Sequence, residues 1–219
     1  MFKIIDRLKN KINKQCYDQT NKVYLIDNKK GTKKLVRSNG IIKGLSIEFL
    51  NSKNNIIEIE EPYYFWNTRI VLRNDNNKIY IKDLVSIISA YINMGGGEFE
   101  VGKNFQSVYN NRFYLGRQKV HIGDDCLFSR YICFYASDGH FIYDLETNNC
   151  INFSNNENII KIGNRVWLGD SVMVLKNSEI LNDSVVGAMS LINKKFCESN
   201  VIIAGNPGEI VKRGIYWKP

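Results

Sequence analysis

Aliphatic residues return every six positions along the C-terminal half of the chain. Read from Ile162, the successive blocks are IGNRVW, LGDSVM, VLKNSE, ILNDSV, VGAMSL and INKKFC. The fifth place of each block is small or β-branched until the last block, where Phe196 stands. A period of six matches neither the roughly 3.6-residue turn of a helix nor the continuous alternation of a long strand. It predicts short flat strands joined by turns.

Three such blocks would close one triangular coil of a parallel β-helix, and the coils would stack at the ~4.8 Å spacing of paired strands. The aliphatic residue would point inward, a Gly, Asn or Asp would take the corner, and the small fifth residue would fit beneath the next coil. Related blocks begin at Ile122, Val101 and Ile81, and alternating segments before them indicate irregular early coils. We therefore expect an all-β chain with a β-helix domain over residues 41–205 and a C-terminal extension over 206–219.

The positive charge is concentrated at the N-terminus. The net charge is +8, and residues 1–40 contain eleven Lys and Arg against three Asp, whereas the remainder is balanced. We assign residues 1–40 to a basic extension, in which Ile4, Ile5, Leu8 and Ile12 have helical spacing. A short amphipathic helix there would cap the β-helix; the alternative is a peripheral contact with a membrane surface. The charge itself is either a solvated face or an attraction for an acidic partner.

Composition narrows the other possibilities. The five cysteines form no CxxC pair, so we expect reduced thiols and no metal site. The N-terminus lacks the apolar region of a secretory signal, and no stretch is long and apolar enough to span a bilayer, which favours a cytoplasmic protein. No sequence pattern of a known RNA- or DNA-binding module accompanies the basic charge, so we expect no nucleic-acid partner.

The six-residue rhythm stops between residues 138 and 160, which predicts a loop that protrudes from the stack. Loops on a rigid scaffold often hold binding and catalytic groups. This loop contains His140, flanked by Asp138 and Asp144, and either carboxylate could orient the imidazole. The alternative is a solvated side chain. The other histidine, His121, precedes a regular block and is better interpreted as an outward residue on a coil face.

These segments resemble a known family. The hexapeptide blocks, the SDGHFIYD loop, the NRVWLGD segment and the closing VIIAGNPGEIVKRGIYW are similar to the left-handed β-helix (hexapeptide-repeat) acetyltransferases. Within that family they most resemble enzymes that O-acetylate bacterial capsular polysaccharide, including polysialic acid. The resemblance is strong over residues 120–217. It implies a left-handed β-helix, a homotrimer, acetyl-CoA as co-substrate, His140 as general base, and Trp167 at the oxyanion site and against the pantetheine arm.

The resemblance also implies a groove for pantetheine and positive charge for the phosphates of CoA. The residues expected to contact CoA are Trp167, Gly169, Gly187, Ala188, Ser190, Lys194, Lys195, Ala204, Gly205, Asn206, Pro207 and Lys212. Each lysine could instead be solvated, and Trp167 could be an aromatic residue that only caps a coil.

The function expected from this resemblance is acetyl-CoA-dependent O-acetylation of a capsular polysaccharide, with an acidic, sialic-acid-containing chain as one acceptor. Two alternatives remain open. The acceptor could be a small sugar, a sugar nucleotide or a lipopolysaccharide unit, or the chain could be a non-catalytic β-helix binding module.

Overall fold

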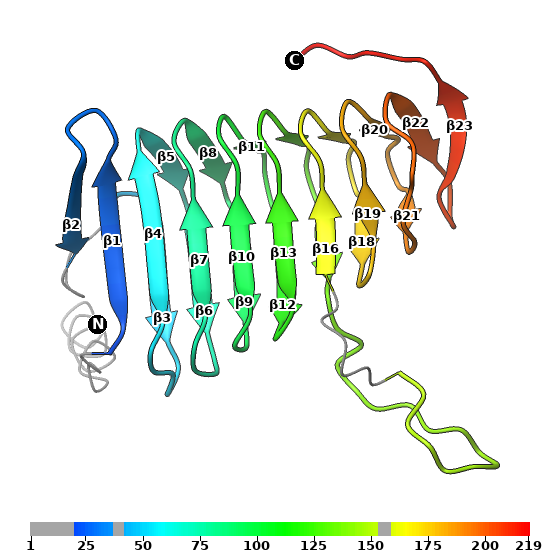
Figure 1. Ribbon diagram of the computed structural model, residues 1–219, viewed down its shortest axis with the longest axis horizontal. Coiled ribbons are helices and arrows are strands. Elements are labelled where there is room, and N and C mark those ends of the chain that lie inside the picture. Colours follow the sequence, from blue (N-terminus) through cyan, green and yellow to red (C-terminus); the bar gives the residue numbers. More distant parts are fainter. Residues whose placement is uncertain (1–19, 37–41, 153–158) are drawn as a thin grey trace, which may run out of the picture.

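The computed structural model describes residues 20–36, 42–152 and 159–219, and within these ranges all regular elements are β-strands (Figure 1). The strands form three sheets, two of eight strands and one of seven, and the pairing is parallel except at the two ends of the stack. We call the three sheets faces 1, 2 and 3. The chain passes from face 1 to face 2 to face 3 and back to face 1, so each complete coil contributes one strand to each face. This is the parallel β-helix that the six-residue period predicts. Within the described ranges, nothing forms a helix of the length and hydropathy needed to cross a membrane.

Except at the two ends of the stack, the strands of each face follow one another at intervals of three along the chain. Face 1 consists of β1 (Lys22–Asp27), β2 (Thr32–Val36), β4 (Ile56–Glu61), β7 (Lys78–Ile81), β10 (Glu98–Val101), β13 (Lys119–Ile122), β16 (Ile159–Ile162) and β19 (Glu179–Ile180). Face 2 consists of β5 (Tyr63–Trp66), β8 (Val85–Ile88), β11 (Gln106–Ser107), β14 (Leu127–Phe128), β17 (Trp167–Leu168), β20 (Val185–Val186), β22 (Val201–Ala204) and β23 (Glu209–Arg213). Face 3 consists of β3 (Leu45–Phe49), β6 (Thr68–Leu72), β9 (Tyr91–Met94), β12 (Arg112–Gly116), β15 (Cys133–Tyr135), β18 (Met173–Leu175) and β21 (Leu191–Ile192).

The predicted inward residues form continuous columns in the core. Ile162 pairs with Ile180 on face 1, one full coil later, and Leu168 pairs with Val186 on face 2 in the same way. All six aliphatic positions of the repeat are buried, and so are all six residues at the fifth place of a block. Because each residue packs mainly against its counterparts in the coils before and after it, no coil could be stable alone.

The corners differ from the expectation in one respect. In the first five blocks the residue with a positive φ is the fourth, as at Arg165 (51°), Asp183 (60°) and Met189 (59°), and not the glycine in second place. The glycine is required for another reason. A Cβ at Gly163 would lie 2.5 Å from Asn182 Oδ1 and 2.8 Å from the Asn182 backbone nitrogen. Glycine therefore allows close approach of the next coil, and the turn itself is made by the fourth residue.

Each end of the stack carries an antiparallel strand. β1 pairs in parallel with β4 and antiparallel with β2, so the first strand of the stack among the described residues begins at residue 22, inside the segment assigned to the 1–40 extension. At the other end β23 pairs antiparallel with β22, inside the predicted 206–219 extension. Both strands continue an existing sheet because an open sheet edge offers unpaired backbone groups. The helix predicted around residues 4–12 lies outside the described residues.

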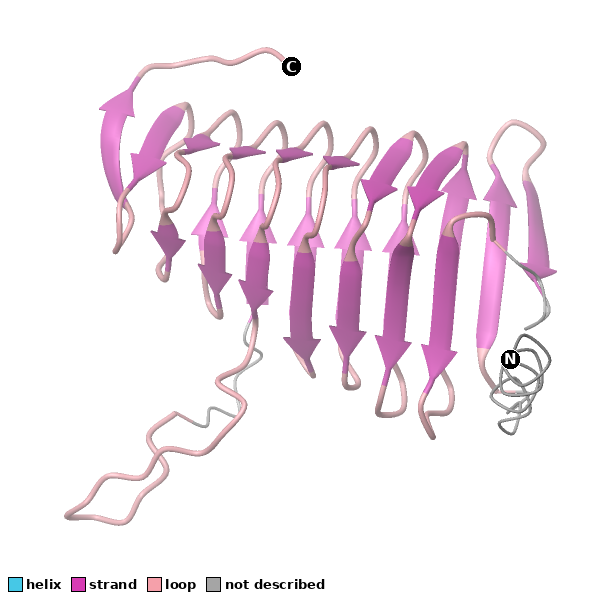
Figure 2. Ribbon diagram, turned by 180° about the vertical axis from the view of Figure 1, so that it is seen from behind, coloured by secondary structure: helices cyan, strands magenta, loops and turns pink. Residues whose placement is uncertain are grey.

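A long loop leaves the stack between β15 and β16, at the corner where face 3 passes to face 1 (Figure 2). It extends well away from the body of the β-helix, and its outer part is held by an antiparallel bridge between Tyr143 and Cys150. This confirms the predicted protrusion.

Candidate active site

The base of the long loop is tied to the following coil. The carboxylate of Asp138 accepts hydrogen bonds from Lys176 Nζ at 2.5 Å and from Asn152 Nδ2 at 2.8 Å. Asn152 Nδ2 also donates to the backbone carbonyl of His140 at 2.8 Å. The hydrogen bond from Lys176 holds the pKa of Asp138 below its ordinary value. The backbone of His140 is thus held by the Asn152 side chain, which the Asp138 carboxylate holds in turn.

The imidazole of His140 itself is exposed, and it makes no hydrogen bond with the described residues. The Asp138 carboxylate is already hydrogen-bonded to Asn152 and Lys176 at the loop base. Asp144 accepts from the backbone nitrogen and the hydroxyl of Thr147, both at 2.7 Å, and these bonds keep the pKa of Asp144 below its ordinary value. Neither of the two candidate carboxylates therefore orients the ring within a single described chain.

Trp167 lies outward on β17 of face 2 and is 38% exposed. Its indole nitrogen donates to Ser129 Oγ at 3.3 Å, which is a long hydrogen bond. The ring of Trp217 lies 6.1 Å from it, centroid to centroid, and Trp217 Nε1 donates to the backbone carbonyl of Arg165 at 2.7 Å. Sequence reasoning missed Trp217. Trp217 ends the closing segment that carries the family resemblance, and an aromatic residue in a polar tail is a further signal that could have indicated it.

Small residues stack directly after face 2, at the corner between faces 2 and 3. Gly169 donates its backbone N–H to Val186, and Gly187 donates to Ile203, both at 2.8 Å. A Cβ at Gly169 would lie 2.8 Å from the Ala188 backbone nitrogen, so no side chain fits there. Gly169, Gly187 and Ala204 thus lie one above another in successive coils, beginning two residues after Trp167, and Ala188 lies next to Gly187 in the middle coil. The structure brings this part of the predicted CoA site together, with Trp167 beside it.

Ser190 belongs to the same corner, but its hydroxyl is directed inward. It is buried, donates to the Gly187 carbonyl at 2.7 Å and accepts from the Gly205 backbone nitrogen at 3.1 Å. The Ser190 hydroxyl is therefore used within the corner itself, and the contact between this small residue and CoA stays a prediction. Gly205, with a φ of 106°, begins the exposed turn that continues through Asn206 and Pro207. This turn closes the corner at its C-terminal end.

The backbones of the predicted phosphate-binding lysines lie away from these small residues, although the Lys194 side chain reaches Glu209, whose backbone pairs with Ala204. Lys194 and Lys195 follow β21 of face 3, and Lys195 forms a bridge with Glu179 of face 1. They therefore lie at the corner between faces 3 and 1, one corner further along than Gly187. The ammonium of Lys194 is 2.5 Å from the Glu209 carboxylate. Lys212 lies exposed on β23.

The candidate base and the column of small residues thus lie at two different corners of one chain. The loop with His140 leaves between faces 3 and 1, whereas the column beside Trp167 lies between faces 2 and 3. Within the described residues, no contact joins His140 to any member of the column.

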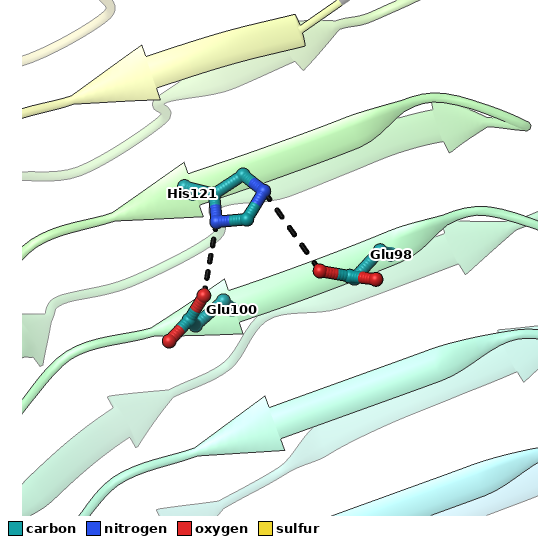
Figure 3. A group of neighbouring side chains, drawn as sticks. All are labelled: Glu98, Glu100 and His121. Carbon is teal, nitrogen blue, oxygen red and sulfur yellow. Dashed lines mark hydrogen bonds and ion pairs between the residues drawn. The ribbon is translucent and has the colours of Figure 1, made fainter. Parts of the chain in front are cut away.

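His121 lies outward on face 1, as predicted. Its Nδ1 is 2.9 Å from Glu100 Oε2, and its Nε2 is 3.9 Å from Glu98 Oε1 (Figure 3). Potential ligand atoms of these three residues lie within 4.8 Å of one another, so they are the candidate metal ligands among the described residues. However, each ring nitrogen faces a different carboxylate. A single cation would therefore require one glutamate to move.

Comparison with known proteins identifies relatives of this architecture. No family model matches the chain. The polysialic acid O-acetyltransferase of Neisseria meningitidis is 30% identical over 187 residues, covering 75% of this chain and 86% of that enzyme. The polysialic acid O-acetyltransferase of Escherichia coli O1:K1 / APEC is 34% identical over 98 residues, or 45% of this chain, and the match spans only 31% of that relative. The crystallographic structure of the polysialic acid O-acetyltransferase OatWY matches with a TM-score of 0.69 at 27% identity, covering 82% of this chain and 86% of that one.

These similarities agree with the described fold. The Neisseria relative is aligned over most of its length, and the OatWY structure shares the stack of coils along most of this chain. The predicted left-handed handedness of the β-helix is confirmed with it. The chain therefore belongs to the hexapeptide-repeat acetyltransferases, a family of acyltransferases built on a left-handed parallel β-helix.

Proposed function

We propose that this protein transfers an acetyl group from acetyl-CoA to a hydroxyl of an acidic capsular polysaccharide, with a sialic-acid-containing chain as the first acceptor to test. One observation carries the proposal. In a chain of this family, a histidine-bearing loop anchored at its base accompanies a column of small residues beside an exposed tryptophan. The relatives named polysialic acid O-acetyltransferase support the choice of acceptor.

His140 is the proposed general base. A sugar hydroxyl is too weak an acid to ionise at neutral pH, so it needs a base that takes its proton as the new C–O bond forms, and a neutral imidazole suits this role. The hydroxyl oxygen attacks the thioester carbonyl carbon, the C–S bond breaks, and the proton passes through the imidazole to the departing sulfur. The products are the acetyl ester and free CoA. Direct transfer requires no acyl-histidine intermediate.

Trp167 is the proposed partner of the developing oxyanion and of the pantetheine arm. A fixed donor at a tetrahedral oxyanion contributes about 3 kcal/mol of transition-state stabilisation. The long hydrogen bond from the Trp167 indole to Ser129 Oγ leaves this donor available for exchange to a stronger acceptor. Beside it, the lack of side chains at Gly169 and Gly187 would let an extended arm approach the backbone.

The separation of these groups supports a site shared between subunits. We propose a homotrimer in which His140 of one subunit meets the small-residue corner of its neighbour. Lys194 and Lys195 would then act from the same corner as His140, on the opposite side of the bound cofactor from Trp167. Dilution below the dissociation constant of the trimer would abolish activity without unfolding a subunit.

We propose that the reaction takes place in the cytoplasm, as the composition favours. The surplus positive charge of residues 1–40 would attract an acidic acceptor, and transfer to such a polymer should fall as salt screens this attraction. Transfer that is insensitive to salt would favour a neutral sugar acceptor.

An acceptor panel tests the proposal. The protein is incubated with acetyl-CoA and polysialic acid, a neutral capsular polysaccharide, a small sugar, a sugar nucleotide or lipopolysaccharide, and release of free thiol is followed. We expect release with polysialic acid, loss of it in His140→Ala, and nearly unchanged CoA affinity in that variant. Release with a small sugar alone would correct the acceptor, and no release with any acceptor would favour a binding module. An equal loss of CoA binding in His140→Ala would make this residue structural.

A further inference from the structure

A polar cleft lies at the corner between faces 3 and 1, on the coils that precede the long loop. It has a volume of about 430 Å³, and its lining includes Arg73, Asn74, Asp75, Asn76, Gly96 and Arg117. These residues follow β6, β9 and β12, the three face 3 strands before β15. The turns after these strands lie along the same edge from which the long loop leaves (Figure 1).

Glycines in the middle coil create the space. Gly95, Gly96 and Gly97 lie between the coil of Arg73 and the coil of Arg117. Gly95 and Gly96 line the cleft. A Cβ at Gly95 would lie 3.2 Å from Asn74 Nδ2, and one at Gly96, where φ is 106°, would lie 3.0 Å from the Asp75 carbonyl oxygen. The middle coil therefore presents only backbone at this corner, and both arginines border the recess.

The floor of the cleft is rigid. A ladder of buried asparagine side chains lies beneath it, in which Asn77 Nδ2 donates to Asn55 Oδ1 at 2.7 Å and Asn55 Nδ2 donates to Asn21 Oδ1 at 2.7 Å. Asn77 Oδ1 in turn accepts from the Gly96 backbone nitrogen at 2.7 Å. Because the ladder fixes the glycine coil against the preceding ones, the recess exists before any ligand binds.

Two arginine side chains give the cleft positive charge that a ligand can reach. Arg69, Arg130, Arg165 and Arg213 each form an ion pair with a carboxylate. Arg73 and Arg117 form none within the described residues, and both are exposed. The one carboxylate of the cleft, Asp75, accepts from the Lys53 backbone nitrogen at 2.8 Å. Two guanidinium groups beside a polar recess match a carboxylate, which arginine binds through paired N–H donors.

The position of the cleft connects it with the loop of His140. A Cβ at Gly116 would lie 3.3 Å from Ser137 Cβ, so the coil of Arg117 directly contacts the start of the loop. With coils ~4.8 Å apart, Arg117 lies about one coil from the loop base and Arg73 about three. A polymer bound along this corner could place an acidic unit in the cleft while another unit reaches the loop.

We infer that Arg73 and Arg117 bind carboxylate groups of an acidic polysaccharide acceptor, and so form a second contact for the polymer beside the transfer site. The inference rests on the proposed function for its choice of ligand. The cleft distinguishes acidic from neutral polymers and sets the affinity for the acceptor, whereas the chemistry occurs at the loop.

Direct binding, measured without acetyl-CoA, tests the inference. The full chain is titrated calorimetrically with polysialic acid and, for comparison, with the neutral polymer dextran. We expect Arg73→Gln and Arg117→Gln to weaken polysialic acid binding about tenfold or more, since each removes a charge-assisted contact. Asn76→Asp should weaken it as well, because it adds negative charge to the cleft with a residue that tolerates the φ of 63° at this position. The matched control is Arg112→Gln, which removes an exposed arginine of face 3 outside the cleft and should change the dissociation constant less than twofold.

Kinetics with the same variants separate this inference from the proposed function. If polysialic acid is an acceptor, the cleft variants should raise its KM and leave kcat and the KM of acetyl-CoA unchanged. Cleft variants that bind polysialic acid like the Arg112 control overturn the inference even if transfer occurs, and so does wild-type protein that does not bind the polymer. Binding that depends on Arg73 and Arg117 without any transfer would sustain the inference and refute the proposed activity.

Discussion

The indole of Trp217 lies beside that of Trp167, with ring centroids 6.1 Å apart, and anchors itself to the Arg165 carbonyl at 2.7 Å. The tail that carries it is fixed by a reciprocal pair of hydrogen bonds between Asn200 and Ile215. The last residues of the chain thus form part of the surface on which acetyl-CoA is proposed to bind.

Removing this contact should weaken cofactor binding. We expect Trp217→Ala to raise the KM of acetyl-CoA about two- to tenfold with little change in kcat, because an aromatic pair contributes about 0.5–1.5 kcal/mol beyond its buried area. Steady-state kinetics with acetyl-CoA as the varied substrate measure this. Tyr216→Ala is the matched control, since Tyr216 is 79% exposed and precedes Trp217 directly. Equal effects of the two substitutions would mean that the tail acts only through its general order.

Mixed oligomers should reveal a site shared between subunits. His140→Ala and Trp167→Ala proteins are each expected to have very low activity. If His140 acts on the small-residue corner of a neighbouring subunit, random reassembly of the two would restore about a quarter of the sites. Thiol release after co-expression or joint refolding measures this recovery. No recovery, with wild-type and His140→Ala chains shown to exchange under the same conditions, would place the whole site in one subunit.

The ion pair at the loop base should make loop anchoring sensitive to acid. Because the pKa of Asp138 is lowered in the folded chain, its contribution is fully present above the ordinary carboxyl value of about 3.9 and is lost as the pH falls through the folded-state pKa. Lys176→Met should remove much of this contribution at neutral pH as well. Proteolysis and hydrogen exchange of residues 138–152 should then be faster.

The control for this substitution is Lys161→Met, at an exposed position of face 1 that takes no part in the contacts of Asp138. If both lysine variants protect the loop as well as the wild type, the Asp138 contact does not anchor it.

Two glycines in second place should respond differently to alanine. At Gly163 the new Cβ would meet the Asn182 backbone nitrogen at 2.8 Å, so we expect a loss of about 1–3 kcal/mol in the free energy of unfolding. At Gly187 the nearest atom is Ala204 Cβ at 3.2 Å, and the loss should be smaller. Gly187→Ala should instead raise the KM of acetyl-CoA. Denaturant unfolding and kinetics separate the two effects, and a Gly187 variant with unchanged KM would remove this residue from the proposed groove.

The period of six fixed the core of this protein in advance. Since each coil takes three blocks and strands pair in register, Ile162, Leu168 and Val174 had to point inward on three successive faces, and the structure buries all three. The interruption at residue 138 likewise marked the long loop between β15 and β16. A repeat determines these features because each side chain's direction follows from its place in the block.

The contacts of side chains at the corners and in the C-terminal tail were decided by the tertiary structure and not by the repeat. The inward hydroxyl of Ser190, the corner that Lys194 occupies and the return of Trp217 onto face 2 depend on contacts between residues far apart in the sequence. The position of Arg73 and Arg117 beside the same glycine-lined cleft also depends on how distant parts of the chain pack together. Turns, tails and long side chains have no period, so only the packing of neighbouring coils determines which of their polar groups meet.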